Sequence, residues 1–221
     1  MGPRCRAIVG GVGGVGMAMA IAMACQDAHA EAGENEKEAG GPEKSLAATA
    51  YWNIPRHGEQ YVTGIVGANV GALRLETRVN YEARRAMSAF VGWTFAGGEA
   101  LTYSATPIVG WVGGDVRGPI GGLEASLAWR KFDYYIEIEY VHDQRERESS
   151  YVYAWSELAY RPADWLRLGL AVQRTRAYQS DRDIQRGPFA QVTFKRVTAG
   201  VYWFNPASSA QVVVVSMGIA F

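Results

Sequence analysis

Few residues of this chain combine the types and spacing that could support chemistry. His142 is followed directly by Asp143, which places a base next to a carboxylate, and Asp181 and Asp183 lie in a later charged stretch. A histidine with several carboxylates could serve general acid–base catalysis or hold a hard cation. No dense ligand spacing accompanies these residues, so His142 is interpreted as the start of a charged loop. We expect no catalytic residue, no metal site and no cofactor.

Residues 1–30 have the organisation of a secretory signal peptide. Two arginines near the N-terminus precede an uncharged stretch of Ala, Gly, Val, Met and Ile over residues 7–24. Ala28-His29-Ala30 then provides the small residues of a cleavage site before Glu31. We expect residues 1–30 to be removed on export, with a transmembrane helix or a lipid attached to Cys25 as the alternatives.

The two cysteines, Cys5 and Cys25, both lie in this segment. Its removal would leave an exported chain with no disulfide, no thiolate nucleophile and no cysteine metal site. The 22 basic and 22 acidic residues balance, so no basic excess favours a nucleic-acid partner, and none is expected.

The remaining chain divides near residue 60. Residues 31–60 begin with an acidic, Gly-rich run and are expected to form a flexible periplasmic segment. Residues 61–221 alternate apolar with small or polar side chains, which indicates β-strands. The whole chain has 26 glycines and 12% aromatic residues, and this region is expected to be an all-β domain, a closed antiparallel up-and-down transmembrane β-barrel.

The barrel is expected to have about ten strands, and eight to twelve remain possible because residues 61–68 could form a separate strand. Short turns such as Gly97-Gly98 and Lys195-Arg196 alternate with longer links such as residues 142–149 and 178–186. This alternation predicts short turns on the periplasmic side and charged loops outside. The strands are expected over residues 70–81, 86–96, 99–112, 118–130, 132–142, 150–161, 165–177, 187–195, 197–204 and 210–221.

One face of these strands mixes charges with small residues and is expected to line the barrel interior. With Lys195 counted, six acids face five bases, which predicts internal ion pairs rather than a strongly selective pore, because unpaired desolvated charges are costly. The expected lumen network is Arg74, Glu76, Arg78, Glu124, Arg130, Asp133, Glu137, Glu139, Glu157 and Arg167.

The other face is apolar, with aromatic residues near both strand ends. Such rings belong at the two membrane–water boundaries of a membrane barrel, whereas a soluble lipocalin-like barrel has no reason to build two girdles. Tyr81 is expected to belong to the same face. The expected membrane girdle is Phe95, Trp111, Trp129, Phe132, Tyr140, Tyr160, Phe194, Trp203 and Phe221.

Together with the export signal, these features make residues 70–221 resemble the small outer-membrane β-barrels of Gram-negative bacteria. The resemblance is architectural, and no motif ties the chain to one characterised member. It implies a location in the outer membrane, in contact with its lipid and lipopolysaccharide. It also implies that Phe221, Ile219, Met217 and Val215 are recognised by the barrel-assembly machinery during insertion.

A barrel of about ten strands lies near the filled end of the size range, so a wide porin is not expected. The sequence predicts a structural barrel or a narrow porin-like channel with a charged, largely filled lumen, and no enzymatic activity. One alternative is an outer-membrane hydrolase with an extracellular-end site near His142. The other is a soluble periplasmic lipocalin-like barrel that binds a ligand inside.

Overall fold

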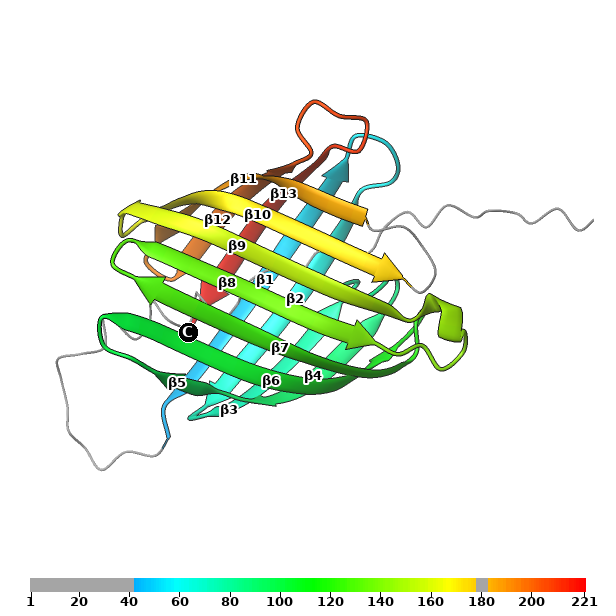
Figure 1. Cartoon of the computed structure of the whole chain (residues 1–221), viewed down its shortest axis with the longest axis horizontal. Coiled ribbons are helices and arrows are strands. Elements are labelled where there is room, and N and C mark those ends of the chain that lie inside the picture. Colours follow the sequence, from blue (N-terminus) through cyan, green and yellow to red (C-terminus); the bar gives the residue numbers. More distant parts are fainter. Residues whose placement is uncertain (1–41, 178–182) are drawn as a thin grey trace, which may run out of the picture.

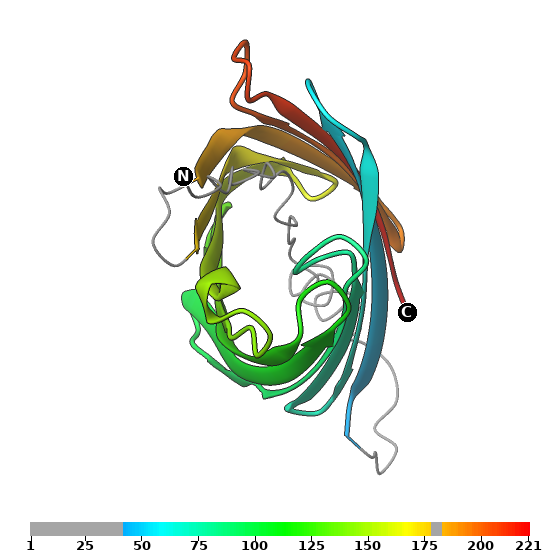
Figure 2. The same cartoon turned by 90° about the vertical axis from the view of Figure 1, so that its right-hand side faces the viewer.

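A computed structural model describes residues 42–177 and 183–221, which form one closed antiparallel β-barrel. The strands are tilted, and the view along the barrel shows their walls completing a ring (Figures 1 and 2). The first strand, β1 (Lys44–Pro55), pairs with the last, β13 (Val212–Ala220), and this pairing closes the sheet. The others are β2 (Tyr61–Val70), β3 (Leu73–Val79), β4 (Met87–Trp93), β5 (Phe95–Gly97), β6 (Leu101–Gly113), β7 (Gly118–Trp129), β8 (Phe132–Val141), β9 (Tyr151–Ala163), β10 (Leu166–Ala177), β11 (Asp183–Phe194) and β12 (Val197–Phe204).

The barrel wall has twelve strands, because β4 and β5 occupy one position in it. Both segments pair with β6, and only Thr94 separates them. The Thr94 hydroxyl lies 2.9 Å from that of Thr106 on β6, so a side-chain contact bridges the interruption.

The predicted all-β, closed antiparallel architecture is confirmed, but the barrel has twelve strands rather than about ten, at the upper limit of the expected range of eight to twelve. Residues 44–55 form β1 instead of belonging to a flexible segment, and residues 61–70 form a strand of their own. The alternation of β1 is weak because alanine occurs on both faces, with Ala47 buried and Ala50 exposed. Gly71, at φ 58°, then makes a turn inside the single strand expected over residues 70–81. The expected signal peptide and residues 31–41 lie outside the described residues.

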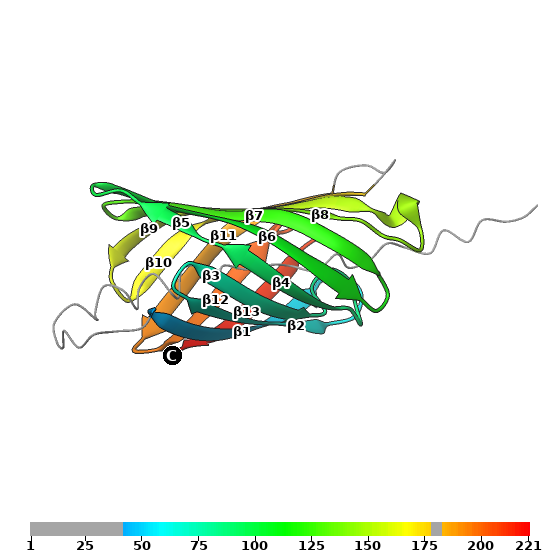
Figure 3. The ribbon, with the colours of Figure 1, turned by 90° about the horizontal axis from the view of Figure 1, so that it is seen from below.

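The two ends of the barrel differ as the sequence predicts. Turns at residues 71–72, 98–100, 130–131, 164–165 and 195–196 share one end, here called the turn end. The links at residues 56–60, 80–86, 114–117, 142–150 and 205–211 share the other, the loop end, where the 3₁₀ helix η1 (Arg147–Ser149) also lies. Figure 3 shows the wall of β1, β2, β3 and β13 facing the wall of β6, β7 and β8 across the barrel.

The two faces of the sheet differ sharply in character. On β3, Arg74, Glu76 and Arg78 are buried, whereas Leu75 and Val79 between and beyond them are exposed. The exposed face carries large apolar residues on every full-length strand, and the charges lie inside. This arrangement excludes the soluble lipocalin-like alternative, which would bury its apolar face. Within the described part of the chain, no helix has the length and apolar character needed to cross a membrane.

Candidate functional site in the barrel interior

Most of the expected lumen network is buried inside the barrel. Nine of its members are at most 5% exposed, although Asp133, Glu157 and their neighbours come from strands far from β3 in the sequence. They form two groups, here named the Arg78 cluster and the Arg167 cluster. The Arg78 cluster comprises Arg74, Glu76, Arg78, Glu124, Glu137 and Glu139, and the Arg167 cluster comprises Asp133, Glu157, Arg161 and Arg167.

One guanidinium is shared by four carboxylates at the centre of the Arg78 cluster. Arg78 Nη1 donates to Glu139 Oε1 at 2.8 Å and to Glu137 Oε1 at 3.2 Å. Arg78 Nε donates to Glu76, and Arg78 Nη2 lies 3.5 Å from Glu124 Oε1. Arg74 also pairs with Glu76 and Glu124. The cluster therefore joins β3 to β7 and β8.

Two aromatic rings lie against the Arg78 guanidinium. Its guanidinium carbon lies 4.2 Å from the centre of the Tyr81 ring and 4.4 Å from that of Phe90. The Tyr81 and Tyr135 hydroxyls both donate to Glu137. Cation–π contacts and charge-assisted hydrogen bonds thus act on the same groups, which fixes the position of the guanidinium.

Glycine makes room for side chains from β3 to reach β7 and β8, although β4 and β6 lie between them. A Cβ atom on Gly110 of β6 would stand 2.4 Å from the Phe90 ring and 2.5 Å from the Ala89 carbonyl oxygen. A Cβ atom on Gly122 of β7 would stand 2.7 Å from the Ile138 carbonyl oxygen and 2.9 Å from Glu139 Cγ. Larger residues at these positions would push the cluster apart.

The Arg167 cluster joins β8, β9 and β10. Arg167 Nη1 donates to Glu157 Oε2 at 2.5 Å, and Arg167 Nη2 donates to Asp133 Oδ1 at 2.7 Å. Arg161 Nε donates to Asp133 Oδ2 at 3.0 Å, and the Arg167 guanidinium lies 4.8 Å from the Phe189 ring centre. Two acids face two bases, so this cluster is balanced.

Buried aromatic residues extend these clusters, and sequence reasoning does not predict their role. Trp155 Nε1 and the Tyr202 hydroxyl both donate to Glu157 Oε1, each at 3.1 Å. Gln191 Nε2 donates to the Tyr202 hydroxyl at 2.8 Å. Their alternation parity was the available signal, since Trp155 is two residues from Glu157 on β9 and therefore on the same face.

The expected near balance of interior charge is wrong. Arg130 and Lys195 are exposed at the turn end, at φ 55° and 54°, where they stack on Trp129 and Phe194. Both follow the last residue of a strand, and their left-handed backbone ends the alternation that predicted an inward side chain. The interior therefore keeps the six predicted acids but only three of the five predicted bases.

The expected girdle residues all lie on the outer face of the barrel. Phe132 and Tyr160 contact each other across β8 and β9, with ring centres 5.1 Å apart. Tyr81 differs, because it is 2% exposed and points inside. Asn80, at φ 56°, follows the last residue of β3, so the strand alternation that predicted an outward Tyr81 stops before that residue. The nine girdle residues are between 41% and 73% exposed, and they are Phe95, Trp111, Trp129, Phe132, Tyr140, Tyr160, Phe194, Trp203 and Phe221.

His142 and Asp143 do not form a pair. The His142 ring stacks on that of Tyr140, with centres 6.3 Å apart, on the outer side of β8. Asp143 is buried and accepts a hydrogen bond from the Arg145 backbone N–H at 2.9 Å. Asp181 and the side chain of Asp183 lie outside the described residues. Within residues 42–177 and 183–221, no group of three His, Cys, Asp or Glu is arranged to hold a metal ion.

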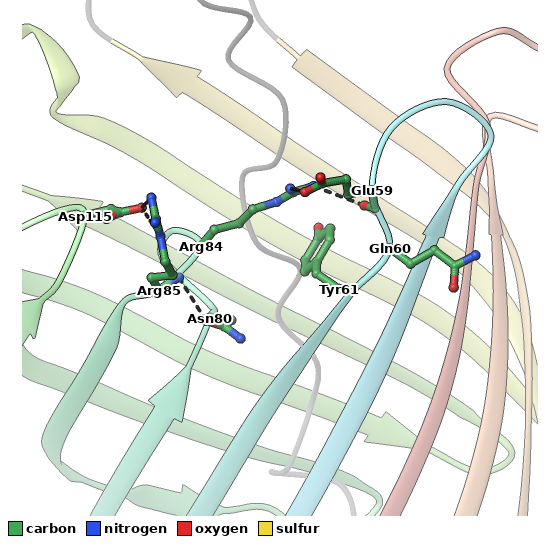
Figure 4. A pocket seen from close by; sticks show the side chains of 7 residues that line it. All are labelled: Glu59, Gln60, Tyr61, Asn80, Arg84, Arg85 and Asp115. Carbon is green, nitrogen blue, oxygen red and sulfur yellow. Dashed lines mark hydrogen bonds and ion pairs between the residues drawn. The ribbon is translucent and has the colours of Figure 1, made fainter.

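A pocket of about 640 Å³ opens at the loop end, and two ion pairs bridge the loops that surround it (Figure 4). Arg84 Nη1 lies 3.0 Å from Glu59 Oε2, and Arg85 Nη2 lies 3.1 Å from Asp115 Oδ2. Arg84 also lies over the Tyr61 ring. Exposed pairs of this kind contribute about 0–1 kcal/mol, so they position the loops only weakly. The lining residues are Glu59, Gln60, Tyr61, Asn80, Arg84, Arg85 and Asp115.

Glu82 brings a further buried carboxylate from the loop between β3 and β4. It is 3% exposed, and its Oε1 accepts a hydrogen bond from the Ser88 hydroxyl at 2.6 Å. Its Oε2 is buried without a hydrogen-bond partner among the described residues. Burial raises the pKa of Glu82 above that of an ordinary carboxyl group, against the opposing effect of Arg78.

Replacing Glu82 with Gln is expected to stabilise the barrel at neutral pH by about 1 kcal/mol, because the amide removes a buried charge and can still accept from Ser88. The raised pKa means that the folded state favours the protonated acid. Stability is therefore greatest below the ordinary carboxyl pKa of about 4.3 and falls as pH rises toward the folded-state value.

The measurement is the temperature at which the folded band is lost on semi-native gel electrophoresis, at neutral and acid pH. The stabilisation by Glu82→Gln should shrink on acidification. Glu59→Gln is the matched control, since that side chain is 87% exposed, and it should change neither value. A lower melting temperature for Glu82→Gln at neutral pH would contradict the assignment.

Known proteins resemble this chain in structure only. No protein-family model matches it, and no curated protein matches its sequence. A KdgM porin matches with a TM-score of 0.59 and 9% identity, over 79% of this chain and 98% of the porin. A KdgM porin in complex with disordered oligogalacturonate matches with a TM-score of 0.56 and 9% identity, over 80% and 98% of the two chains. A NanC porin matches with a TM-score of 0.52 and 10% identity, over 80% and 98%.

The structural similarities and the placement of charged residues inside the barrel indicate the same fold. The chain has the fold of a porin-like outer-membrane β-barrel, with buried salt bridges in its interior.

Proposed function

We propose that this porin-like outer-membrane β-barrel is a narrow channel whose lumen is largely filled by the Arg78 and Arg167 clusters. The observation that carries the proposal is the buried salt-bridge network itself. Buried ion pairs are often no more stabilising than apolar side chains of the same volume, so a barrel serving only as a membrane anchor gains little from them. A polar interior is the property that aqueous passage requires.

The wall formed by β12, β13, β1 and β2 supports a path beside the clusters. Its inward positions include small residues such as Gly200, Ser216 and Thr49, and the large buried side chains of this wall, Tyr51, Tyr202 and Phe204, lie nearer the loop end. The Tyr202 hydroxyl, on β12 of this wall, donates to Glu157 Oε1 at 3.1 Å, so the Arg167 cluster reaches this wall. The path would run between the small residues and the carboxylates.

The loop end is proposed to face the outside and the turn end the periplasm. In bacterial barrels short turns are periplasmic and long loops are extracellular. The mixed charges of residues 142–150 would then meet lipopolysaccharide phosphates and their bridging cations.

Purified protein in a planar bilayer is expected to give a small, steady conductance. A cysteine at Ser216 tests the path directly, since a charged thiol reagent of about the size of the lumen should reduce the current. Val215→Cys is the matched control, because Val215 is the neighbour on β13 that faces outward. A current that ignores modification at residue 216 would place the path elsewhere.

A sealed structural barrel is the second candidate, and one observation favours it. Arg78 is 1% exposed, and Glu157 and Tyr202 are 0% exposed, so water reaches little of the barrel centre. A bilayer trace that stays silent, with folded protein present, would support the sealed barrel and reject the channel.

A further inference from the structure

We infer that the channel passes small cations in preference to anions, because the Arg78 cluster holds more carboxylates than guanidinium groups. This inference rests on the proposed channel function and specifies what it transports. The cluster has four carboxylates, Glu76, Glu124, Glu137 and Glu139, and two arginines. Acidic side chains around a pore are the common basis of cation selectivity.

Glu82 provides an independent sign that negative charge is in excess here. Glu82 is only 3% exposed, and its Oε2 has no hydrogen-bond partner among the described residues. Its Oε1 accepts a hydrogen bond from Ser88 of β4, which is paired with Arg78 across the sheet, so Glu82 adds a fifth carboxylate close to the same cluster. Arg78 already contacts four carboxylates, which leaves Glu82 without a basic partner of its own in the described structure.

Charge in excess inside a barrel must be compensated by something that can enter it. Charges in a low-dielectric interior interact more strongly than in water, and an unpaired one is costly. Mobile cations or protons are the species that can supply the missing positive charge. Anions approaching the same site are repelled, because the guanidinium groups are already surrounded by carboxylates.

Other charges along the barrel do not reverse this preference. The Arg167 cluster holds two acids and two bases. Apart from Glu82, the described loop-end links carry six bases and five acids. The turns at the other end carry four exposed bases, Arg130, Lys131, Lys195 and Arg196, and two exposed acids, Glu99 and Asp164, and water and salt screen these charges over about 10 Å. The loop-end residues counted are Arg56, Arg84, Arg85, Arg117, Arg145, Arg147, Glu59, Asp115, Asp143, Glu146 and Glu148.

The test is the reversal potential of the full-length protein in a planar bilayer under a potassium chloride gradient. We expect a cation-to-anion permeability ratio above about three. The double variant Glu137→Gln and Glu139→Gln leaves three carboxylates, those of Glu76, Glu124 and Glu82, facing two guanidinium groups, and it should lower the ratio toward one. If the double variant does not fold, the single variant Glu82→Gln replaces it in the test. Residue 82 lies outside the strands, and this substitution should also lower the ratio.

Glu99→Gln is the matched control, because Glu99 is exposed in a turn-end link, and it should leave the ratio unchanged. A wild-type ratio at or below one would overturn the inference while the channel function stands. A ratio unchanged in both Glu variants would also overturn it, since the selectivity would then arise elsewhere. Absence of any current from folded protein would instead reject the channel function.

Discussion

Replacing Arg78 with Ala is expected to cost about 3–5 kcal/mol of stability, because it leaves buried carboxylates without their shared partner. The Arg78 guanidinium lies within 3.5 Å of four carboxylates, those of Glu76, Glu124, Glu137 and Glu139. Arg74 would remain, but it contacts only Glu76 and Glu124 among them. The truncation also removes the group that lies against the Tyr81 and Phe90 rings.

The loss should appear as a lower midpoint in urea unfolding from lipid vesicles and as a lower yield of folded barrel. Arg85→Ala is the matched control, because the Arg85–Asp115 pair is 85% and 46% exposed at its two side chains. Its cost should stay within about 1 kcal/mol. Equal midpoints for Arg78→Ala and the wild type would mean that protons or bound cations, not Arg78, neutralise the carboxylates.

Replacing Phe221 with Asp is expected to reduce the folded protein in the outer membrane severalfold. Phe221 follows β13 and is 59% exposed, and its backbone N–H donates to the Leu46 carbonyl at 2.8 Å. An acidic residue at the membrane boundary costs only about 0–1 kcal/mol, so lipid contact alone predicts a small effect. A large loss in cells would therefore reflect recognition of this residue during assembly.

Two comparisons separate assembly from stability. Refolding of purified Phe221→Asp into lipid vesicles should approach the wild-type yield, since no machinery takes part. Phe194→Asp is the control in cells, because Phe194 is a 73% exposed girdle residue at the same end but on β11. If Phe194→Asp lowers the outer-membrane level as much as Phe221→Asp, the loss arises from the girdle and not from recognition of the last strand.

The alternation of side chains was enough to predict the architecture and which face is apolar. On β3, the charged and apolar positions separate cleanly, and the structure places them inside and outside as expected. Period-two alternation does not reveal a strand where both faces carry small residues, so the sequence pattern does not predict β1. It also cannot position a turn within a long regular run, as Gly71 shows.

The interior could be predicted in composition but not in its charge balance. If the alternation of a strand is extended one residue past its end, that residue can be predicted to point inward. A left-handed backbone at or near that residue can instead turn its side chain to the opposite face. Arg130 and Lys195 leave the interior in this way, and Tyr81 enters it after Asn80. The set of carboxylates that share Arg78 depends on how closely side chains from β3 approach β7 and β8 past Gly110 and Gly122. The residue pattern of a single strand does not contain the distance between strands.

The pairing of β1 with β13 makes the barrel dependent on its most distant segments. Nine residue pairs, from Ala47 with Ala220 to Pro55 with Val212, join strands that are separated by nearly the whole described chain. Closing so long a loop has an entropic cost before any contact is gained, and folds dominated by such contacts form slowly. Until β13 is in place, the sheet has two open edges able to pair with another chain, so folding and protection from aggregation are completed in the same step.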